Sequence, residues 1–481
     1  MICLTLSGNT LESCLEEIEA NRSYIDSAEL RLDYLTPEEQ KKAASFPSMA
    51  GLPVILTLRR KEDGGKCTLS ERERRALLLS ALDGDYAYVD IEEDVKKNDV
   101  EDKAREKGVK IIRSFHDFSG IPDDIYSRLY RLAERGDIAK AAVTPHTTQD
   151  LLTLFRIAEE LKDVPKIIIG MGDWGIPIRI LYKKAGSLLT FACSGEAVAP
   201  GQVSAKDLKL LYRADKVNDR TGIYGIIGNP VLHTSSPSIH NPGFQSINYN
   251  AIYLPFLVDN VRIFFALAEY LKMRGFSVTV PFKDAVLMYL GNITREVKQI
   301  GACNTVVRMP GMWKGMNTDY YGFLQPILPE LESGKIKSAL VIGAGGASQA
   351  VVWALRNRGV KVTILNRTLT KAEKLAKLNI CEYDTLDNAH LYEGKVDLVV
   401  QTTSVGLFPN FDTSPVPDFH FTGKEIAYDI IYKPKMTKFL QDAEKAGCTL
   451  HFGEEMLLEQ GKLQFEAFTG YHYPKDLHPS L

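Results

Sequence analysis

The chain contains 481 residues, of which 45% are hydrophobic and 25% are charged, and its formal net charge is −3. This length predicts three domains of roughly 150 residues, and the composition is that of a globular protein. The small net charge argues against an overall positive field that would hold nucleic acid or an anionic membrane, although a local arginine cluster could still bind a small anion.

The first 200 residues alternate between short apolar runs and helical patterns. Two of the helical patterns are clear, at 70–82 and 148–162. Eight strand-and-helix alternations in about 200 residues are typical of an α/β fold of the (β/α)8 TIM-barrel type. The eight predicted strands lie at 2–6, 27–35, 53–59, 86–92, 109–115, 138–144, 166–172 and 187–193.

Polar residues stand near the ends of these predicted strands or directly after them. In a TIM barrel the active site lies at the carboxyl ends of the strands, so these side chains are candidates for one common site. They are Glu29, Arg31, Arg59, Glu92, His116 and Arg179.

Lys140 lies within the apolar strand "IAKAAV". If it faces the barrel interior, desolvation should lower its pKa, and a neutral amine can form a Schiff base. An outward-facing or snorkelling lysine is the alternative, which periodicity does not resolve. His116, at the end of the fifth strand, is either a structural histidine or a base that moves a proton beside such an imine.

Residues 1–213 resemble the type I 3-dehydroquinate dehydratases. The resemblance is carried by "ELRLDYL" (29–35), "TLRRKEDGG" (57–65), "FHDF" (115–118), "IAKAAVTP" (138–145), "MGDWGIPIR" (171–179) and "APGQ" (199–202). It implies that Lys140 forms an imine with the substrate ketone, and that His116 removes the adjacent proton and helps water to leave. It also implies a substrate pocket formed by Thr5, Glu29, Arg31, Arg59, Arg179 and Gln202.

The chain departs from this family's pattern at four positions. Ile169 stands in place of a methionine, Asp173 of a lysine and Ile178 of a serine. Val198 replaces a serine four residues before Gln202, which removes a hydrogen bond to the substrate. The first three are interpreted as packing changes, whereas Val198 puts substrate affinity in doubt but leaves the Schiff base possible.

A polar stretch near residue 217 marks the predicted end of the barrel. Beyond it, four hydroxyl residues cluster within "GNPVLHTSSPSIHN" (228–241), where they could cap a helix or bind a carboxylate beside a helix N-terminus. Lys283 follows the predicted strand in "FSVTVPFKDAV" (276–286), and "NT" pairs follow two further apolar runs.

The segment "SALVIGAGGASQAVVWALRNRGVKVTIL" (338–365) predicts a strand, a glycine turn, a helix and a second strand. Glycines at 343 and 345 permit a tight turn and close approach to a pyrophosphate, which predicts a Rossmann dinucleotide-binding lobe. The second strand is followed by Asn366, Arg367 and Thr368 rather than by an acid. An arginine can pair with a 2′-phosphate, so NADP is favoured over NAD, although Arg367 could also be an ordinary surface residue.

Residues 221–481 resemble the shikimate dehydrogenases. The motifs are "YGIIGNPVLHTSSPSIHN", "VTVPFK", "NTDYYG", "GAGGAS", "NRT", "TTSVGL" (402–407), "YDIIYKP" (428–434) and "MLLEQGKLQFEAFTG" (456–470). The resemblance implies that Lys283 and Asp319 handle the proton at the substrate oxygen. It further implies substrate contacts from Thr234, Ser236, Thr279, Asn304, Tyr432 and Gln460, and NADP contacts from Gly343, Ala344, Gly345, Gly346, Ala347, Asn366, Arg367, Thr368 and Gly453.

Three departures occur in this half. Thr234 replaces a serine, Ser277 an asparagine and Tyr320 a glycine. These changes could shift the preference between shikimate and quinate.

The two resemblances together predict a bifunctional enzyme of consecutive reactions, in which 3-dehydroquinate loses water and the resulting enone is reduced to shikimate. The expected domains are a barrel at 1–216, a substrate lobe at 217–325 completed by 456–481, and a Rossmann lobe at 326–455. Three alternatives stay open: a different Schiff-base barrel such as a class I aldolase, a degenerate binding barrel beside an active oxidoreductase, and quinate as the main oxidoreductase substrate.

Seven scattered cysteines without a CxxC pair argue against disulfides and zinc and favour a reducing cytoplasm. No signal peptide and no apolar run of ~20 residues is recognised. We therefore expect a cytoplasmic enzyme with small-molecule substrates, NADP(H) as its cofactor, no metal, no nucleic acid or membrane partner and no obligate protein partner.

Overall fold

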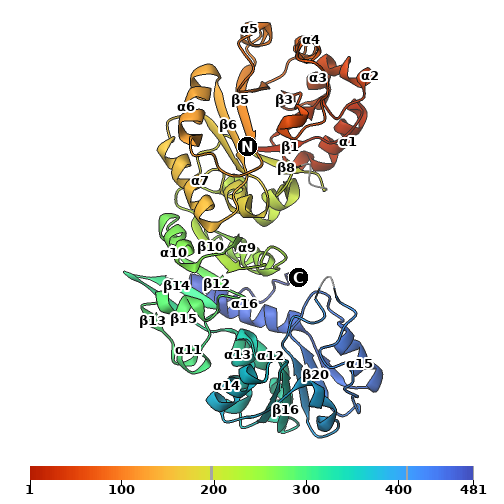
Figure 1. Ribbon diagram of the computed structural model, residues 1–481, viewed down its shortest axis with the longest axis vertical. Coiled ribbons are helices and arrows are strands. Elements are labelled where there is room, and N and C mark those ends of the chain that lie inside the picture. Colours follow the sequence, from red (N-terminus) through yellow and green to blue (C-terminus); the bar gives the residue numbers. More distant parts are fainter. Residues whose placement is uncertain (196–198, 408–409, 480–481) are drawn as a thin grey trace. The chain divides into compact units, whose positions relative to one another are not determined.

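The computed structural model describes residues 1–195, 199–407 and 410–479. By their contacts these residues divide into two compact units, whose elements are labelled in Figure 1. The first unit consists of Met1–Ile223 with Asn250–Lys272, and the second of Tyr224–Tyr249 with Met273–Leu481. No helix in the described ranges is long and apolar enough to cross a membrane.

The first unit is built around a parallel β-barrel. Each strand from β1 to β7 pairs with the next, β1 also pairs with β8, and a backbone bridge between Lys166 and Ser187 spans the gap from β7 to β8. This arrangement confirms the predicted (β/α)8 fold. The strands are β1 (Ile2–Thr5), β2 (Ser27–Arg31), β3 (Val54–Thr57), β4 (Tyr88–Glu92), β5 (Lys110–Asp117), β6 (Ile138–Val143), β7 (Lys166–Gly170) and β8 (Thr190–Cys193).

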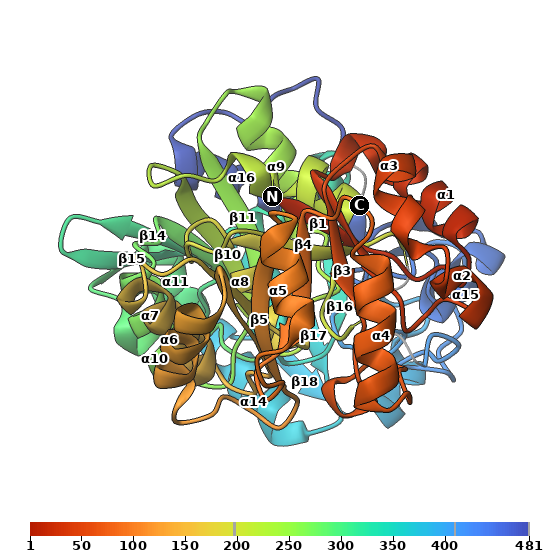
Figure 2. The same cartoon turned by 90° about the horizontal axis from the view of Figure 1, so that it is seen from above.

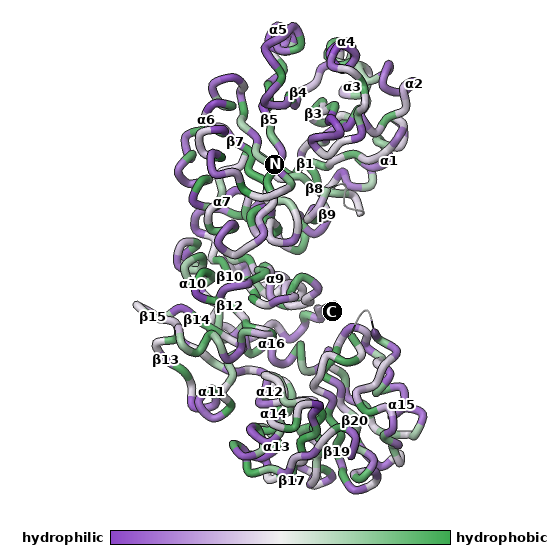
Figure 3. The backbone as a smooth tube through the Cα atoms, viewed as in Figure 1, coloured by the Kyte–Doolittle hydropathy of each residue, from purple (hydrophilic) through white to green (hydrophobic). Residues whose placement is uncertain are grey.

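Helices surround these strands, as Figure 2 shows for α4 and α5 beside β3, β4 and β5. The helix predicted at 70–82 is α4 (Glu71–Ala81), which begins where the Ser70 hydroxyl accepts a hydrogen bond from the Glu73 amide, in a capping box. Figure 3 shows hydrophilic and hydrophobic residues alternating along the barrel helices. The others are α1 (Leu11–Asn21), α2 (Pro37–Gln40), α3 (Phe46–Ala50), α5 (Asp99–Glu106), α6 (Ile125–Arg135), α7 (Thr148–Glu160) and α8 (Ile176–Ile180).

The first unit also contains β11 (Ala251–Leu257) and α10 (Val261–Tyr270), which follow the barrel in the sequence. The Thr148 hydroxyl at the start of α7 donates to the Asp259 carboxylate over 2.6 Å. The Tyr270 hydroxyl donates to the Phe155 carbonyl over 3.1 Å. These bonds fasten a segment from the second half of the chain to the barrel helix α7.

The second unit begins with a mixed sheet. Strand β10 (Gly222–Gly228) pairs in parallel with β12 (Gly275–Val278), which pairs antiparallel with β14 (Thr305–Met309) and is followed outward by β15 (Met312–Met316) and β13 (Asn292–Ile293). Helix α16 (Gly453–Thr469) crosses α12 (Asp319–Glu332) closely, since a Cβ on Gly322 would lie 2.7 Å from the Met456 carbonyl oxygen. The remaining helices of this region are α9 (Ser236–Ser246) and α11 (Arg295–Ile300).

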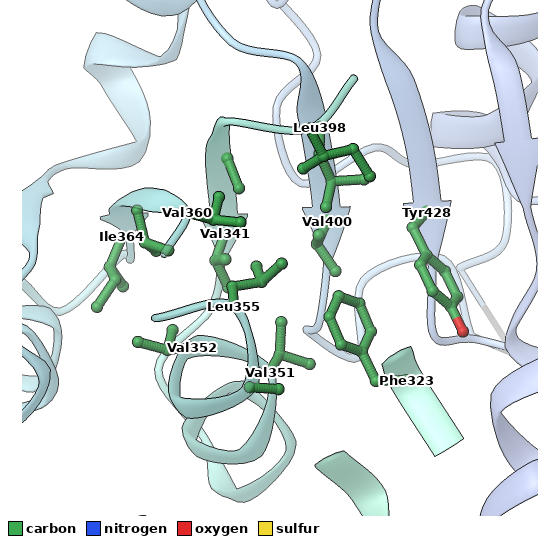
Figure 4. Packing of buried hydrophobic residues seen from close by; sticks show 14 of the residues in the cluster. Phe323, Val341, Val351, Val352, Leu355, Val360, Ile364, Leu398, Val400 and Tyr428 are labelled. Atoms are coloured by element: carbon green, nitrogen blue, oxygen red, sulfur yellow. The ribbon is translucent and has the colours of Figure 1, made fainter. Parts of the chain in front are cut away.

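A six-stranded parallel sheet in the order β18-β17-β16-β19-β20-β21 follows. The predicted strand–turn–helix–strand is confirmed as β16 (Ser338–Ile342), α13 (Gly346–Asn357) and β17 (Lys361–Leu365). In Figure 4, Val341, Val351, Leu355 and Val400 pack together. The Phe323 ring stacks on that of Tyr428, with 5.0 Å between the ring centres. The other elements are β18 (Glu382–Asp384), β19 (Leu398–Gln401), β20 (Ile426–Asp429), β21 (Thr449–His451), α14 (Leu369–Asn379) and α15 (Lys438–Ala446).

Candidate active sites

The carboxyl ends of the barrel strands surround a pocket. Its lining contains the residues that the sequence predicted for this half except Glu92, together with Asp63, Gly64, Phe118, Met171 and Phe191, which the sequence did not predict. A single site is therefore assembled from residues nearly 200 positions apart. The predicted residues in the lining are Thr5, Glu29, Arg31, Arg59, His116, Lys140, Arg179 and Gln202.

Lys140 faces the barrel interior, with 4% of its surface exposed. Its Nζ lies 2.8 Å from Oδ2 of Asp90 and 4.4 Å from the centre of the Phe191 ring. The outward-facing alternative is thus wrong. Asp90 was missed in the sequence, although "YVDIE" places it two residues before Glu92, and alternation along a strand turns both side chains toward the same face.

Asp90 belongs to a buried row of alternating charges. Its Oδ1 lies 2.8 Å from the Arg59 guanidinium, whose NH1 donates to Glu92 over 3.0 Å. Glu92 in turn pairs with Arg74 over 2.8 Å. Burial opposes ionisation of Asp90, but the charges of Arg59 and Lys140 outweigh it and hold the pKa of Asp90 well below its ordinary value. Each charge in this row therefore has a counter-charge, as buried ions require.

His116 is the penultimate residue of β5 and lines the pocket. Its Nδ1 is buried and accepts or donates no hydrogen bond among the described residues. Burial, together with the positive charges of Arg59 and Lys140, holds the pKa of His116 well below the ordinary 6.5. The imidazole is consequently neutral near pH 7 and able to accept a proton.

Arg179 lies in the short helix α8 rather than in a loop. Its Nε donates to the Gly170 carbonyl over 2.6 Å, but no carboxylate within the described residues forms an ion pair with it. Burial lowers the pKa of Arg179 to about 10, at which the group is still a cation near neutral pH. A buried cation without a counter-ion suits an anionic ligand. Arg31, in contrast, is neutralised by two bonds of 2.9 and 2.7 Å to Asp33.

The polar wall of the pocket is formed by Thr5, Glu29 and Gln202. The Thr5 hydroxyl donates to Glu29 over 3.2 Å and accepts from the Gln202 amide over 3.3 Å. These groups supply both donors and acceptors for substrate hydroxyls. Ile169 lines the pocket as an apolar side chain and Ile178 is fully buried.

Two further departures in this half have different outcomes. Asp173 begins a single turn of 3-10 helix, Asp173–Gly175, before α8. Val198 lies outside the described residues. The expected loss of a hydrogen bond at Val198 stays a prediction.

A second group of predicted residues surrounds Lys283. Its Nζ donates to Asp319 over 2.6 Å, and both side chains are largely buried. Asn304 donates to Asp319 over 2.8 Å and to the Gln460 side chain over 3.3 Å. Asn304, and through it Gln460 of α16, thereby join the Lys283–Asp319 ion pair in one hydrogen-bonded network. Thr279 follows β12 directly and packs against Gly228.

The hydroxyl cluster lies at the start of α9. Thr234 donates to the Ser236 hydroxyl over 3.1 Å and accepts from the Ser236 amide over 3.2 Å. Burial raises the pKa of Tyr432, whose hydroxyl is hydrogen-bonded to Thr234. Lys433 donates to Ser235 over 2.8 Å and adds a cation that the sequence analysis missed, although it stands beside Tyr432 in "YDIIYKP". Three hydroxyls and one ammonium group suit a carboxylate.

Two of the departures in this half have structural roles. The buried Ser277 hydroxyl donates to Gln464 over 2.8 Å, and Gln464 donates to the Asn304 carbonyl over 3.2 Å. Ser277 therefore supports the backbone of Asn304 from behind. The Tyr320 ring packs edge-on against Trp353 of α13 at 5.0 Å, which ties α12 to the dinucleotide lobe.

The glycine turn after β16 is shaped for a close backbone approach. Gly343 has a φ of +118°, and a Cβ there would lie 2.5 Å from the Thr402 hydroxyl. Ala344 and Gly345 follow it, and Gly346 and Ala347 begin α13. A Cβ on Gly346 would lie 3.1 Å from Cδ of Lys283, so the turn and the Lys283–Asp319 pair adjoin each other. Amides at this helix N-terminus suit a pyrophosphate.

Asn366, Arg367 and Thr368 follow β17. The Asn366 amide donates to the Thr368 carbonyl over 2.9 Å and closes this short turn. Arg367 is exposed, and no carboxylate among the described residues pairs with it. Gly453 opens α16, where a Cβ would lie 2.4 Å from the Ile430 carbonyl oxygen, so close packing alone accounts for a glycine there.

The described residues contain no group of three or more His, Cys, Asp or Glu side chains placed to hold a metal ion. Nor are any cysteines joined there, since all seven carry free thiols.

Comparison with known proteins gives matches over nearly the whole chain. Residues 2–219 match a family described as type I 3-dehydroquinase, 226–306 the shikimate dehydrogenase substrate-binding domain, and 327–408 shikimate/quinate 5-dehydrogenase. The chloroplastic bifunctional 3-dehydroquinate dehydratase/shikimate dehydrogenase of Arabidopsis thaliana is 34% identical over 99% of this chain and 83% of that protein.

Two other relatives match the second half only. The NADP+ shikimate dehydrogenase of Caldanaerobacter subterraneus subsp. tengcongensis is 38% identical over 54% of this chain and 96% of its own length. The crystal structure of shikimate dehydrogenase from Aquifex aeolicus is also 38% identical, covers 54% of this chain and 96% of that chain, and superposes with a TM-score of 0.50.

Proposed function

We propose that this chain, which belongs to the family of bifunctional 3-dehydroquinate dehydratase/shikimate dehydrogenases, catalyses both reactions. Its barrel converts 3-dehydroquinate to 3-dehydroshikimate through an imine on Lys140. Its second unit reduces this product to shikimate with NADPH. The observation that carries the proposal is the inward-facing Lys140 in one pocket with His116 and the cation Arg179. A complete set of reactive groups favours an active dehydratase over a degenerate barrel.

In the barrel, the Lys140 nitrogen adds to the ketone carbon and water leaves, which gives an iminium. The iminium withdraws electrons and acidifies the adjacent carbon. His116, neutral at its buried position, takes the proton from that carbon and then protonates the departing hydroxyl. Arg179 binds the substrate carboxylate, and Thr5, Glu29 and Gln202 orient its hydroxyls.

In the second unit, the Lys283 ammonium faces the carbonyl oxygen of 3-dehydroshikimate and donates a proton to it. Asp319 holds Lys283 in position over 2.6 Å. Thr234, Ser236 and Tyr432 bind the carboxylate, while Asn304, Thr279 and Gln460 line the ring. NADPH, when bound at the glycine turn, supplies the hydride.

The cofactor site fits NADP on two observations. The close-packed turn at Gly343 leaves no space for a Cβ, as a backbone-bound pyrophosphate requires. Arg367 is an exposed cation after β17, where it can pair with a 2′-phosphate. We assign Ala344, Gly345, Gly346 and Ala347 to the pyrophosphate, Asn366 and Thr368 to the ribose phosphate, and Gly453 to the nicotinamide side.

The proposal extends to the organisation of the chain. It assigns the dehydratase to 1–216, the substrate lobe to 217–325 with 456–481, and the NADP lobe to 326–455. It includes no metal and no obligate protein partner. Seven free thiols suit a reducing compartment such as the cytoplasm. Quinate is the second candidate for the reductase, which the departures at Thr234 and Ser277 motivate.

The deciding experiment follows NADPH absorbance in a mixture of the purified chain, NADPH and 3-dehydroquinate. Consumption of NADPH with formation of shikimate supports both assignments. If NADPH persists, 3-dehydroshikimate is added: renewed consumption leaves the reductase intact but contradicts the barrel assignment, and continued silence contradicts both. Oxidation of shikimate and quinate by NADP+ then compares the two substrates.

Replacing Arg367 with alanine is expected to raise the KM for NADPH about 10- to 100-fold while changing the KM for NADH little. The lost interaction is a charge-assisted hydrogen bond to the 2′-phosphate, which is worth about 1.5–3 kcal/mol. Initial rates with each nucleotide measure the effect. The control is Arg358→Ala, which removes an exposed arginine at the C-terminal end of α13, the end away from the glycine turn. Equal losses with both nucleotides would contradict the assignment.

In the pH profile of kcat for dehydration, the midpoint of the acidic limb is expected to lie below pH 6.5. The buried His116 has a pKa well below 6.5, so its neutral, proton-accepting form persists until the pH falls through that lowered value. Because kcat reports the covalent complex, in which Lys140 is already an imine, the limb reports the histidine. A pH–rate profile with saturating 3-dehydroquinate checks this, and a midpoint at or above pH 6.5 would contradict it.

A further inference from the structure

We propose that Asp90 is a further catalytic residue of the dehydratase site: its carboxylate aims the Lys140 nitrogen at the pocket and balances the positive charge that this nitrogen carries in the imine. The inference rests on the proposed role of Lys140. Asp90 is not among the residues that line the pocket, but it is in hydrogen-bond contact with the Lys140 Nζ.

The geometry holds Asp90 in one orientation. Its side chain is completely buried, and Oδ2 lies 2.8 Å from the Lys140 Nζ. The other oxygen, Oδ1, lies 2.8 Å from the Arg59 guanidinium and accepts from the Ser114 hydroxyl over 2.5 Å. Ser114 stands opposite Lys140 in the pairing of β5 with β6. The carboxylate is thus clamped on one side and presents its second oxygen to the amine.

The lysine nitrogen has apolar surroundings on another side. Nζ lies 4.4 Å from the centre of the Phe191 ring, which lines the pocket. An aromatic face can attract a cation but offers no full counter-charge. The full negative charge in hydrogen-bond contact with Nζ among the described residues is that of Asp90.

The charge on the nitrogen explains why a carboxylate is useful there. The overall step is Lys–NH3+ + O=CR2 → Lys–NH+=CR2 + H2O, in which a C=N bond replaces the C=O bond and the oxygen leaves with two protons of the ammonium. The nitrogen is positive before and after the step and neutral only while it attacks. Asp90 therefore faces a cation at both ends of the step and stabilises the iminium in a site of low dielectric.

Glu92 provides a matched comparison. It is equally buried and belongs to the same row of charges, but its contacts are with Arg59 and Arg74 rather than with Lys140. If the row serves only to fill the barrel with paired charges, neutralising Asp90 or Glu92 should have similar consequences. If Asp90 serves the imine, the two substitutions should differ in the amount of imine formed.

The test compares Asp90→Asn with Glu92→Gln in the full chain. Each protein is incubated with 3-dehydroshikimate and sodium borohydride, and the reduced adduct on Lys140 is quantified by mass spectrometry beside kcat for dehydration. We expect Asp90→Asn to lower kcat at least about 100-fold and to lower the labelled fraction at least about tenfold, whereas Glu92→Gln changes each less than about tenfold. Asp90→Glu, which keeps the charge, is expected to recover part of the labelling.

The outcomes separate the inference from the proposed function. A wild-type chain that is not labelled on Lys140 contradicts the Schiff-base assignment itself. A labelled wild type together with Asp90→Asn that labels equally and retains kcat within about threefold overturns the role of Asp90. If Asp90→Asn does not fold, a crystal structure of the reduced wild-type adduct provides the test. Asp90 Oδ2 within about 3.2 Å of the adduct nitrogen supports the role. A carboxylate turned away from that nitrogen overturns the role.

Discussion

Replacing Lys140 with methionine is expected to lower kcat for dehydration of 3-dehydroquinate at least about 10³-fold, while reduction of 3-dehydroshikimate by the same chain continues at the wild-type rate. Methionine has similar length but no nitrogen, so the iminium cannot form and the adjacent carbon is not acidified. Formation of the enone, followed by ultraviolet absorbance, measures the first activity, and NADPH consumption with added 3-dehydroshikimate measures the second.

The matched control is Lys110→Met, which removes an exposed lysine at the start of β5. That substitution should leave both activities within about twofold of wild type, as is usual for exposed positions away from functional groups. Dehydration that survives in Lys140→Met, in a chain whose melting temperature is unchanged, would mean that the barrel does not use a Schiff base on this lysine. Loss of both activities together would indicate unfolding rather than lost chemistry.

Replacing Lys283 with methionine is expected to lower kcat for reduction of 3-dehydroshikimate about 10²- to 10⁴-fold and to leave dehydration unchanged. The ammonium supplies both the proton and the positive charge at the substrate oxygen, and methionine supplies neither. Rates at saturating NADPH separate this effect from cofactor binding. Lys298→Met, at an exposed position on α11, is the control.

The Lys283–Asp319 pair should also behave as a unit. Because Asp319 acts by holding the ammonium over 2.6 Å, Asp319→Asn in a chain that already carries Lys283→Met should cost little further rate. Additive losses would mean that Asp319 contacts the reacting atoms on its own account.

Much of the fold was predictable because its signals are local. Eight apolar runs at regular spacing indicated eight barrel strands, and all eight form. The helical patterns at 70–82 and 148–162 form as α4 (Glu71–Ala81) and α7 (Thr148–Glu160), each of which begins with a capping box. The glycine turn after β16 was equally readable, since its chemistry is contained in six consecutive residues.

Much of the barrel site was predictable for a different reason. Lys140, His116 and Arg179 stand in motifs that the type I dehydratases share, so a resemblance named them before any contact was known. The periodicity of the strand did not decide which way Lys140 faces. That depends on the register of β6 within the closed barrel, and a shift of one residue would have turned the amine outward.

The sequence by itself thus determined the two families, the element order and most of the reactive side chains, because propensities and motif spacing act over a few neighbouring residues. The tertiary structure alone left Arg179 without a carboxylate beside it among the described residues. It alone also decided which side chains meet: Asp90 with Lys140, Lys433 with the hydroxyl cluster, and Lys283 with the backbone at Gly346. Such pairs join positions from 50 to nearly 200 residues apart. Their distances follow from strand register and helix packing, which no local pattern encodes.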